Sequence, residues 1–188
     1  MSHVSDYLAE TKRIADAIGV TTIERMVDEL VALRKRCGRL YVAGLGGSAA
    51  NASHAANDFR QLCGIEAYCL TDNVASITAR ANDLGWERSL ELTFAGQRDA
   101  LLVLSVGGGS NGVSVPLIEA ATHIRKVGGT LLGIVGRDGG FIGQHAKVAI
   151  VIPIVSELRV TPHTEGWQMV ILHCLVSHPR LQTSPTKW

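Results

Sequence analysis

The sequence predicts a three-layer, doubly wound α/β domain with a five-stranded parallel sheet, preceded by two helices. Short apolar runs alternate with helical segments along the chain, which is the order of elements in such folds. Each run is apolar throughout instead of alternating apolar and polar residues, as expected of strands covered by helices on both faces. Several runs end in glycine-rich turns, which form the ligand-binding edge of an open parallel sheet.

Two helices open the chain. Apolar side chains recur at helical spacing over residues 7–18, and a second apolar face follows over residues 23–33. Thr21 and Glu24 have the spacing of a capping box at the start of that second helix. We expect a single domain over residues 1–188, made of helices at 1–37, an α/β core at 38–178 and a C-terminal arm at 179–188.

The core itself repeats strand and helix without a linker or an internal repeat. Its expected strands lie at residues 40–43, 67–70, 100–105, 130–135 and 148–154. Its expected helices lie at residues 49–62, 74–95, 115–127, 141–145 and 164–177.

The composition is that of a globular protein: 46% of the 188 residues are hydrophobic and 19% are charged. A chain of this length buries roughly 70% of its unfolded surface, so one core is sufficient. The net charge of +1, with no basic run beyond residues 34–36, argues against nucleic-acid and membrane-surface partners. Apolar runs such as residues 149–155 are only strand-length, so we expect no transmembrane segment. The N-terminus lacks a signal-peptide layout, which favours the cytoplasm.

The four cysteines are scattered without a CxxC pair, so we expect reduced and mostly buried side chains at Cys37, Cys63, Cys69 and Cys174. A surplus of apolar residues and glycines, with few charges to cover the surface, predicts an oligomer with glycine-lined ligand loops.

The first candidate ligand loop is the segment from Gly44 to Ser48. Backbone N–H groups and the positive end of the following helix can meet an anion there, while Ser48 offers a hydroxyl. The segment is neither a Walker A loop nor a GxGxxG motif, because it has no lysine and the residue three after Gly46 is Ala49. Taken alone, the loop is equally consistent with a tight strand-to-helix turn.

The second loop, from Ser105 to Ser110, again offers glycine amides and hydroxyls before a helix. Two such loops in one small sheet are more than turns require. Neutral donors without a lysine suit a phosphomonoester, because one doubly charged group accepts many hydrogen bonds. The sequence therefore indicates a sugar-phosphate ligand.

Titratable side chains fall on two helices. His54 and Asp58 have i, i+4 spacing, which suits metal ligands or acid/base partners and is also common for a plain surface contact. Glu165 and His173 are eight residues apart on the last helix, about 12 Å along its axis, so a shared metal needs long reaches or a frayed first turn. The two pairs together would make a His/Asp/Glu/His site for zinc or a similar divalent ion.

In their order along the chain, these motifs resemble a known family. The segments that carry the resemblance are residues 44–54, 82–85, 105–110 and 136–140, followed by Glu165 and His173. The sequence is similar to the sugar isomerase (SIS) domain of the phosphoheptose isomerase type. That resemblance implies a homotetramer with active sites between subunits, which converts sedoheptulose 7-phosphate into glycero-manno-heptose 7-phosphate for surface polysaccharide.

The resemblance also implies roles for individual residues. It places substrate contacts at Gly46, Gly47, Ser48, Asn82, Asp83, Ser105, Gly107, Ser110 and Glu165. It places zinc ligands at His54, Asp58, Glu165 and His173. Asp58 and His173 also fall at catalytic positions, as base and acid for moving a proton between C1 and C2 through an enediol.

This chain departs from the family pattern at the ligand. Asp58 stands where the family has glutamate, Glu165 replaces a glutamine and Leu45 replaces an asparagine. Val106 and Gly107 replace two hydroxyl residues, and about four extra residues lie around 112–116. These departures predict an altered substrate or a weakened isomerase. The alternative is a non-catalytic SIS module that binds a sugar phosphate or a protein partner.

Overall fold

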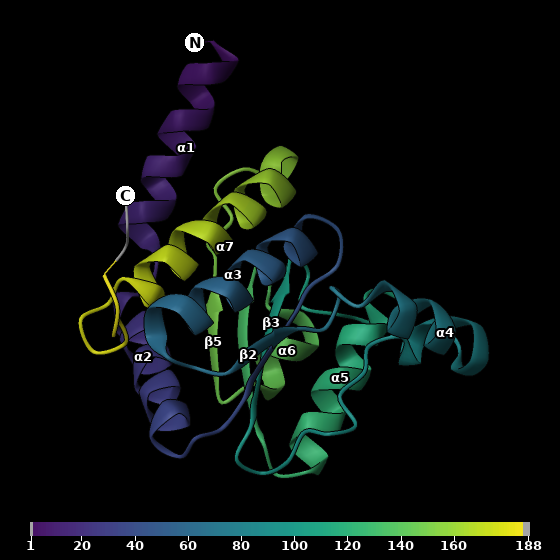
Figure 1. Ribbon diagram of the computed structural model, residues 1–188. Helices are drawn as coiled ribbons and strands as arrows, with labels where there is room; N and C mark the ends of the chain where they lie inside the picture. Colours follow the sequence, from purple (N-terminus) through teal and green to yellow (C-terminus); the bar gives the residue numbers. More distant parts are fainter. Residues whose placement is uncertain (1, 186–188) are drawn as a thin grey trace.

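The computed structural model describes residues 2–185 and shows helices on both faces of one parallel sheet (Figure 1). The strand order β2-β1-β3-β4-β5 and the parallel pairing of all neighbours confirm the doubly wound α/β prediction. The strands are β1 (Leu40–Ala43), β2 (Ala67–Cys69), β3 (Ala100–Ser105), β4 (Thr130–Val135) and β5 (Val148–Val151).

Two apolar clusters hold the three layers together. One packs α1, α2, α3 and α7 against the sheet face that carries Leu40, Val42 and Leu102. The other packs α5 and α6 against the opposite face, which carries Tyr41 and Leu101. The helices are α1 (His3–Ala17), α2 (Val20–Lys35), α3 (Gly47–Cys63), α4 (Val74–Leu84), α5 (Val115–Lys126), α6 (Gly140–His145) and α7 (Val160–Val176), with short 3₁₀ turns η1 (Trp86–Arg88) and η2 (Glu157–Arg159).

Several predicted element ends were wrong. The capping box does not form, because α2 begins at Val20 with Gly19 as its N-cap and without a side-chain cap bond. The helix expected at 74–95 stops at Leu84, where Gly85 adopts a left-handed φ of +91°. The last strand ends at Val151, two residues before Pro153, which has no N–H to donate to a neighbouring strand. The last helix begins four residues earlier than expected, at Val160.

The segment after the last helix is docked on its own domain up to residue 185. Leu181 is fully buried, and its carbonyl accepts a hydrogen bond from the Arg34 guanidinium. The Thr183 amide donates to the Leu62 carbonyl at the end of α3. Within the predicted arm, residues 181–183 therefore pack against the domain, and residues 186–188 lie outside the described part.

The cysteine prediction is confirmed in part. All four thiols are free, but only Cys63 and Cys69 are buried, while Cys37 and Cys174 are exposed. Burial raises the pKa of the Cys63 thiol to about 11, so this side chain packs as an unreactive apolar group. No helix within residues 2–185 has the length and apolar character needed to cross a membrane.

Candidate active site

The β1–α3 loop combines a tight turn with a ligand-facing side chain. A side chain at Gly44 would collide with the Ser48 carbonyl, so the close-packing interpretation of this glycine is correct. Gly46 is the N-cap of α3 with a φ of +61°, a backbone conformation that L residues rarely adopt. Ser48, on the first turn of α3, is 2% exposed and lines a cavity. The loop therefore serves both as a turn and as one wall of the site.

The β3–α5 loop is bound to the start of α6. The N–H groups of Phe141 and Ile142 donate to the carbonyls of Gly109 and Gly108, at 2.8 and 2.9 Å. Within the loop, the Gly108 amide donates to the Ser105 hydroxyl oxygen at 3.1 Å. The loop is therefore fixed in place, but at least one of the amides expected to hold an anion is already engaged.

The extra residues after this loop begin with a small hairpin. Ser110 and Val113 exchange backbone hydrogen bonds of 3.1 and 3.0 Å around Asn111 and Gly112, and the Gly112 φ is +80°. A turn with positive φ at its second central position favours glycine there, which fits Gly112. The hairpin engages the Ser110 amide and forms a further wall of the cavity.

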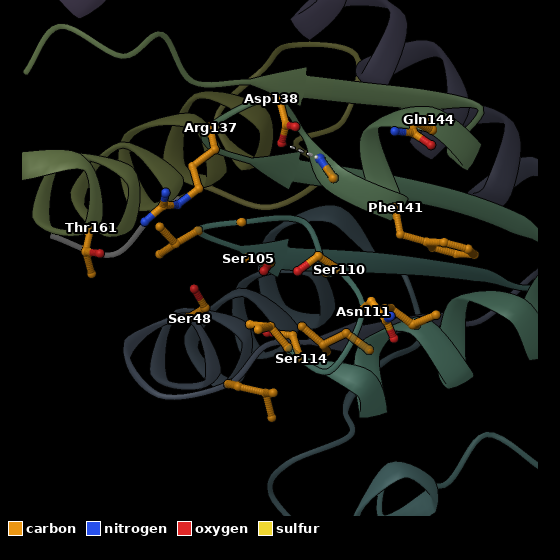
Figure 2. Close-up of a pocket in the computed structure, with 18 residues that line it drawn as sticks. Ser48, Ser105, Ser110, Asn111, Ser114, Arg137, Asp138, Phe141, Gln144 and Thr161 are labelled. Carbon is orange, nitrogen blue, oxygen red and sulfur yellow. Dashed lines mark hydrogen bonds between the residues drawn. The ribbon is translucent and has the colours of Figure 1, made fainter. Parts of the chain in front are cut away.

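These loops enclose a cavity of about 850 Å³ at the carboxyl edge of the sheet. Four residues expected to contact the substrate line it: Ser48, Ser105, Gly107 and Ser110. Figure 2 shows Ser105 and Ser110 between Ser48 on one side and Asn111 on the other. The structure thus brings the two predicted loops together around one ligand-sized space.

The cavity is also lined by polar residues that were not predicted to belong to the site. These are Asn111, Ser114, Arg137, Asp138, Gln144 and Thr161. Arg137 and Asp138 follow β4 inside the glycine-rich segment 136–140, so the carboxyl-edge rule was a signal that could have found them. Thr161 had no such signal, because it depends on where α7 begins.

A separate cluster of titratable groups joins α3 to α7. The ligand atoms of His54, Asp58 and His173 lie within 4.8 Å of one another. The His54 Nε2 is 3.1 Å from an Asp58 carboxylate oxygen and 3.2 Å from the His173 Nε2. The Asp58 side chain is 9% exposed, whereas the imidazoles are 47% and 59% exposed. A buried carboxylate therefore lies beneath two accessible histidines.

Polar contacts one turn earlier hold the two helices in register. The Asn51 side-chain amide donates to the Gln168 side-chain oxygen at 3.0 Å and to the Glu165 carbonyl at 2.9 Å. Gln168 is fully buried, so this contact fixes how α3 and α7 are aligned. His54 lies about one turn beyond Asn51 on α3, and the alignment brings it to His173.

Glu165 lies outside this cluster. Its carboxylate packs against Gly47, where an added Cβ would be 2.6 Å from the carboxylate carbon. A negative charge at the start of α3 is favourable because of the helix dipole. The structure thus brings together Gly47 and Glu165, both expected at the substrate, without placing Glu165 beside the two histidines. The role of Glu165 as a metal ligand stays a prediction.

Asn82 and Asp83 lie away from the cavity within this single chain. They sit in the last turn of α4, are exposed, and hydrogen bond to each other at 2.8 Å. Neither residue lines the cavity. Their predicted contact with substrate stays a prediction.

The fold and the site together define a class: a doubly wound α/β domain with a hydroxyl-lined cavity at the carboxyl edge of its sheet and a His/Asp cluster on adjacent helices. Residues 6–136 match the family model described as the SIS domain. The chain belongs to this family, in its phosphoheptose isomerase branch.

The relatives support this assignment over most of the chain. The chain is 32% identical over 154 residues to a phosphoheptose isomerase of Roseiflexus sp. (strain RS-1), covering 74% of this chain and 76% of the relative. It is 30% identical over 180 residues to a phosphoheptose isomerase of Trichlorobacter lovleyi, covering 92% and 87%. A phosphoheptose isomerase structure from Francisella tularensis has the same fold, with a TM-score of 0.81 at 20% identity over 94% of this chain and 97% of that one. By their names, these relatives are enzymes that isomerise a sugar phosphate.

Proposed function

We propose that this protein is a ketose/aldose isomerase that interconverts sedoheptulose 7-phosphate and glycero-manno-heptose 7-phosphate. The observation that carries the proposal is the cluster of His54, Asp58 and His173, which lies on the same helix pair as the cavity residues Ser48 and Thr161. A buried carboxylate beneath two exposed imidazoles suits general acid and base catalysis, which a binding module does not require.

In this proposal, binding and chemistry use different parts of α3. Ser48 contributes to the phosphate end of the site, together with Ser105 and Ser110. His54 and Asp58 follow six and ten residues later, about 9 and 15 Å along the helix axis. A sugar phosphate anchored in the cavity and extended along α3 therefore brings its far end to the cluster.

Asp58 and His173 are suited to move protons. Asp58 acts as the base that removes the proton between C1 and C2, because its carboxylate is largely shielded from water. His173 acts as the acid at the sugar oxygen, since its exposed ring is accessible to a ligand on the surface of α7. General acid and base catalysis of this kind contributes about 10²- to 10⁴-fold each to a rate.

The cluster also suits a divalent cation. Two imidazole nitrogens and one carboxylate oxygen are ligands that zinc accepts, and their mutual distances of up to 4.8 Å allow one ion to reach all three. When bound, the ion supplies positive charge beside the sugar oxygens. Glu165 would have to turn away from Gly47 to become a fourth ligand.

The surface supports self-association as a homotetramer. No residue of α4 is buried, and its apolar side chains Val74 and Leu84 are 69% and 48% exposed. Trp86 and Phe94, which follow α4, are 54% and 77% exposed. A helix that has no fully buried residue and exposes apolar side chains is expected to pack on a neighbouring subunit, which would carry Asn82 and Asp83 towards another active site. We place the protein in the cytoplasm, where sugar phosphates occur.

The test is turnover of sedoheptulose 7-phosphate by zinc-loaded and chelator-treated protein, with metal content measured in parallel. We expect turnover that falls on chelation and returns with zinc. Asp58→Asn and His173→Gln should each lower kcat by at least 100-fold without altering the oligomer. Full activity in either variant would refute that residue's role.

The non-catalytic alternative predicts a different result. Metal-loaded wild-type protein would then bind sugar phosphates in a calorimeter and show no turnover. In that case, the departures from the family pattern at Asp58 and Leu45 would explain why catalysis is lost.

A further inference from the structure

One positively charged side chain, that of Arg137, lines the cavity. Arg137 lines the cavity beside Thr161, and Figure 2 shows its guanidinium directed towards the side that Thr161 and Ser48 also line. Within residues 2–185 its guanidinium takes part in no hydrogen bond or ion pair. The neighbouring carboxylate of Asp138 is engaged separately, because it accepts the Gly140 amide at 3.1 Å.

The backbone of Arg137 is also unusual. Its φ is +49°, in the left-handed region that strongly favours glycine, although glycines lie close by at Gly136 and Gly139. A side chain at Gly136 would collide with Thr164, so a side chain can leave this turn only from the next positions. An unfavourable backbone conformation at a pocket residue is typical of a functional requirement for its side chain.

The position of the Arg137 stem matches a gap in the phosphate loop. A Cβ built on Gly107 would lie 3.7 Å from the Arg137 Cδ, so the arginine stem passes over the open face of Gly107. The resemblance described above places a hydroxyl residue at Gly107. The amides of Gly108 and Ser110 are already bonded within the loop. A phosphate here thus finds two of the loop amides already engaged, and it meets serine hydroxyls together with one guanidinium group.

We propose that Arg137 is the cationic anchor for the substrate phosphate, which makes it the residue that selects phosphorylated over unphosphorylated sugars. The inference rests on the proposed function for the identity of the sugar, but not for the phosphate contact itself. Guanidinium groups bind phosphate through two parallel hydrogen bonds, and the arginine charge persists at every pH of interest. The glycine loops alone predict neutral donors for the anion, and the proposed anchor adds a charged donor to them.

The decisive variant is Arg137→Gly, because glycine removes the side chain and relieves the left-handed backbone. We expect the melting temperature to equal or exceed that of the wild type, while the affinity for sedoheptulose 7-phosphate falls about 10- to 100-fold by calorimetry. Arg137→Lys should lose less affinity, since it keeps the charge without the fork.

The matched control is Cys37→Gly. Cys37 has a similar φ of +52° but precedes β1, at the opposite edge of the sheet from the cavity. The same relief of the backbone there should leave phosphate affinity unchanged. An effect of Cys37→Gly as large as that of Arg137→Gly would overturn the inference.

The pH dependence of binding separates a charge contact from a structural role. A phosphomonoester gains its second negative charge near pH 6. Wild-type affinity should therefore rise between pH 5 and pH 7, and Arg137→Gly should flatten that rise. Equal affinities and equal pH profiles in the two proteins would refute the phosphate contact.

Inorganic phosphate is the probe that distinguishes this inference from the proposed function. If the wild type binds phosphate in an Arg137-dependent way but neither binds nor converts the heptose phosphate, the anchor stands and the proposed function fails. If the wild type converts the heptose phosphate and Arg137→Gly binds it equally well, the anchor fails alone. If the wild type binds neither ligand, both are refuted.

Discussion

Gly108 lies where the β3–α5 loop crosses the start of α6, and only a residue without a side chain fits there. A Cβ at this position would collide with the Gly139 carbonyl, and the Gly108 φ is +67°. Gly112, at the tip of the small hairpin, has a similar φ of +80° but open space around it. A side chain at Gly112 would therefore meet backbone strain alone, whereas one at Gly108 would meet both strain and a steric collision.

We expect Gly112→Ala to lower the free energy of unfolding by about 1 kcal/mol, which is the cost of an L residue in the left-handed region. Gly108→Ala should lower it by at least 1 kcal/mol more, because the collision is with backbone that cannot rotate away. Urea denaturation of the two variants and the wild type measures both values. Equal losses in the two variants would show that the loop moves to accept a side chain.

Among the elements, α1 is joined to the start of α7 by a charged cluster. Glu10 on α1 is 5% exposed and accepts hydrogen bonds from Arg159 at 2.7 Å and from His163 at 2.8 Å. The His163 ring also stacks on Tyr7 at 4.3 Å between centroids. These contacts fix the first turn of α7, which carries Thr161 to the cavity. The N-terminal helix thus helps to shape the ligand site without touching it.

This cluster makes stability depend on pH in acid. The Arg159 hydrogen bond, followed by that of His163, lowers the pKa of Glu10 from 4.5 to about 2. Because the folded pKa is depressed, the contribution of Glu10 is complete above pH 4.5 and is lost as the pH falls towards 2. At pH 7, Glu10→Gln should unfold at a lower urea concentration than the wild type. Between pH 4.5 and pH 3, its stability should decline less than that of the wild type.

The control for this variant is Glu24→Gln. Glu24 is exposed and pairs with Arg180 at 3.5 Å on the surface, where an ion pair contributes little to stability. Glu24→Gln should therefore show the same decline in stability between pH 4.5 and pH 3 as the wild type. If the stability of the wild type declined as little between pH 4.5 and pH 3 as that of Glu10→Gln, the acid dependence could not be assigned to Glu10.

The elements also show what the sequence could and could not predict. The strands and the two ligand loops were predicted, because continuous apolar runs and glycine turns are local patterns. Arg137 was missed as an anchor because its contribution depends on a left-handed φ, which residue types alone do not reveal. The location of the Glu165 carboxylate was missed because it depends on how α7 packs beside α3.

At the scale of the whole molecule, the apolar surplus in the composition is only partly explained by the core. The two clusters beneath and above the sheet account for the buried apolar residues. The α4–η1 segment adds three exposed apolar side chains, Val74, Leu84 and Trp86. A tetramer would cover that surface and bring Asn82 and Asp83 to a neighbouring cavity.

The double variant Leu84→Asp with Trp86→Asp should therefore dissociate the assembly, because two charges in a buried interface lack partners. Light scattering after gel filtration should give about 80 kDa for the wild type, four copies of the 20.1 kDa chain, and a smaller mass for the variant. Isomerase activity should fall with the mass, although His54, Asp58 and His173 are unchanged, because Asn82 and Asp83 no longer reach a second subunit. Lys126→Glu, at the exposed end of α5, is the charge-change control and should keep both mass and activity. A wild-type monomer, or a variant that stays tetrameric, would place the interface elsewhere.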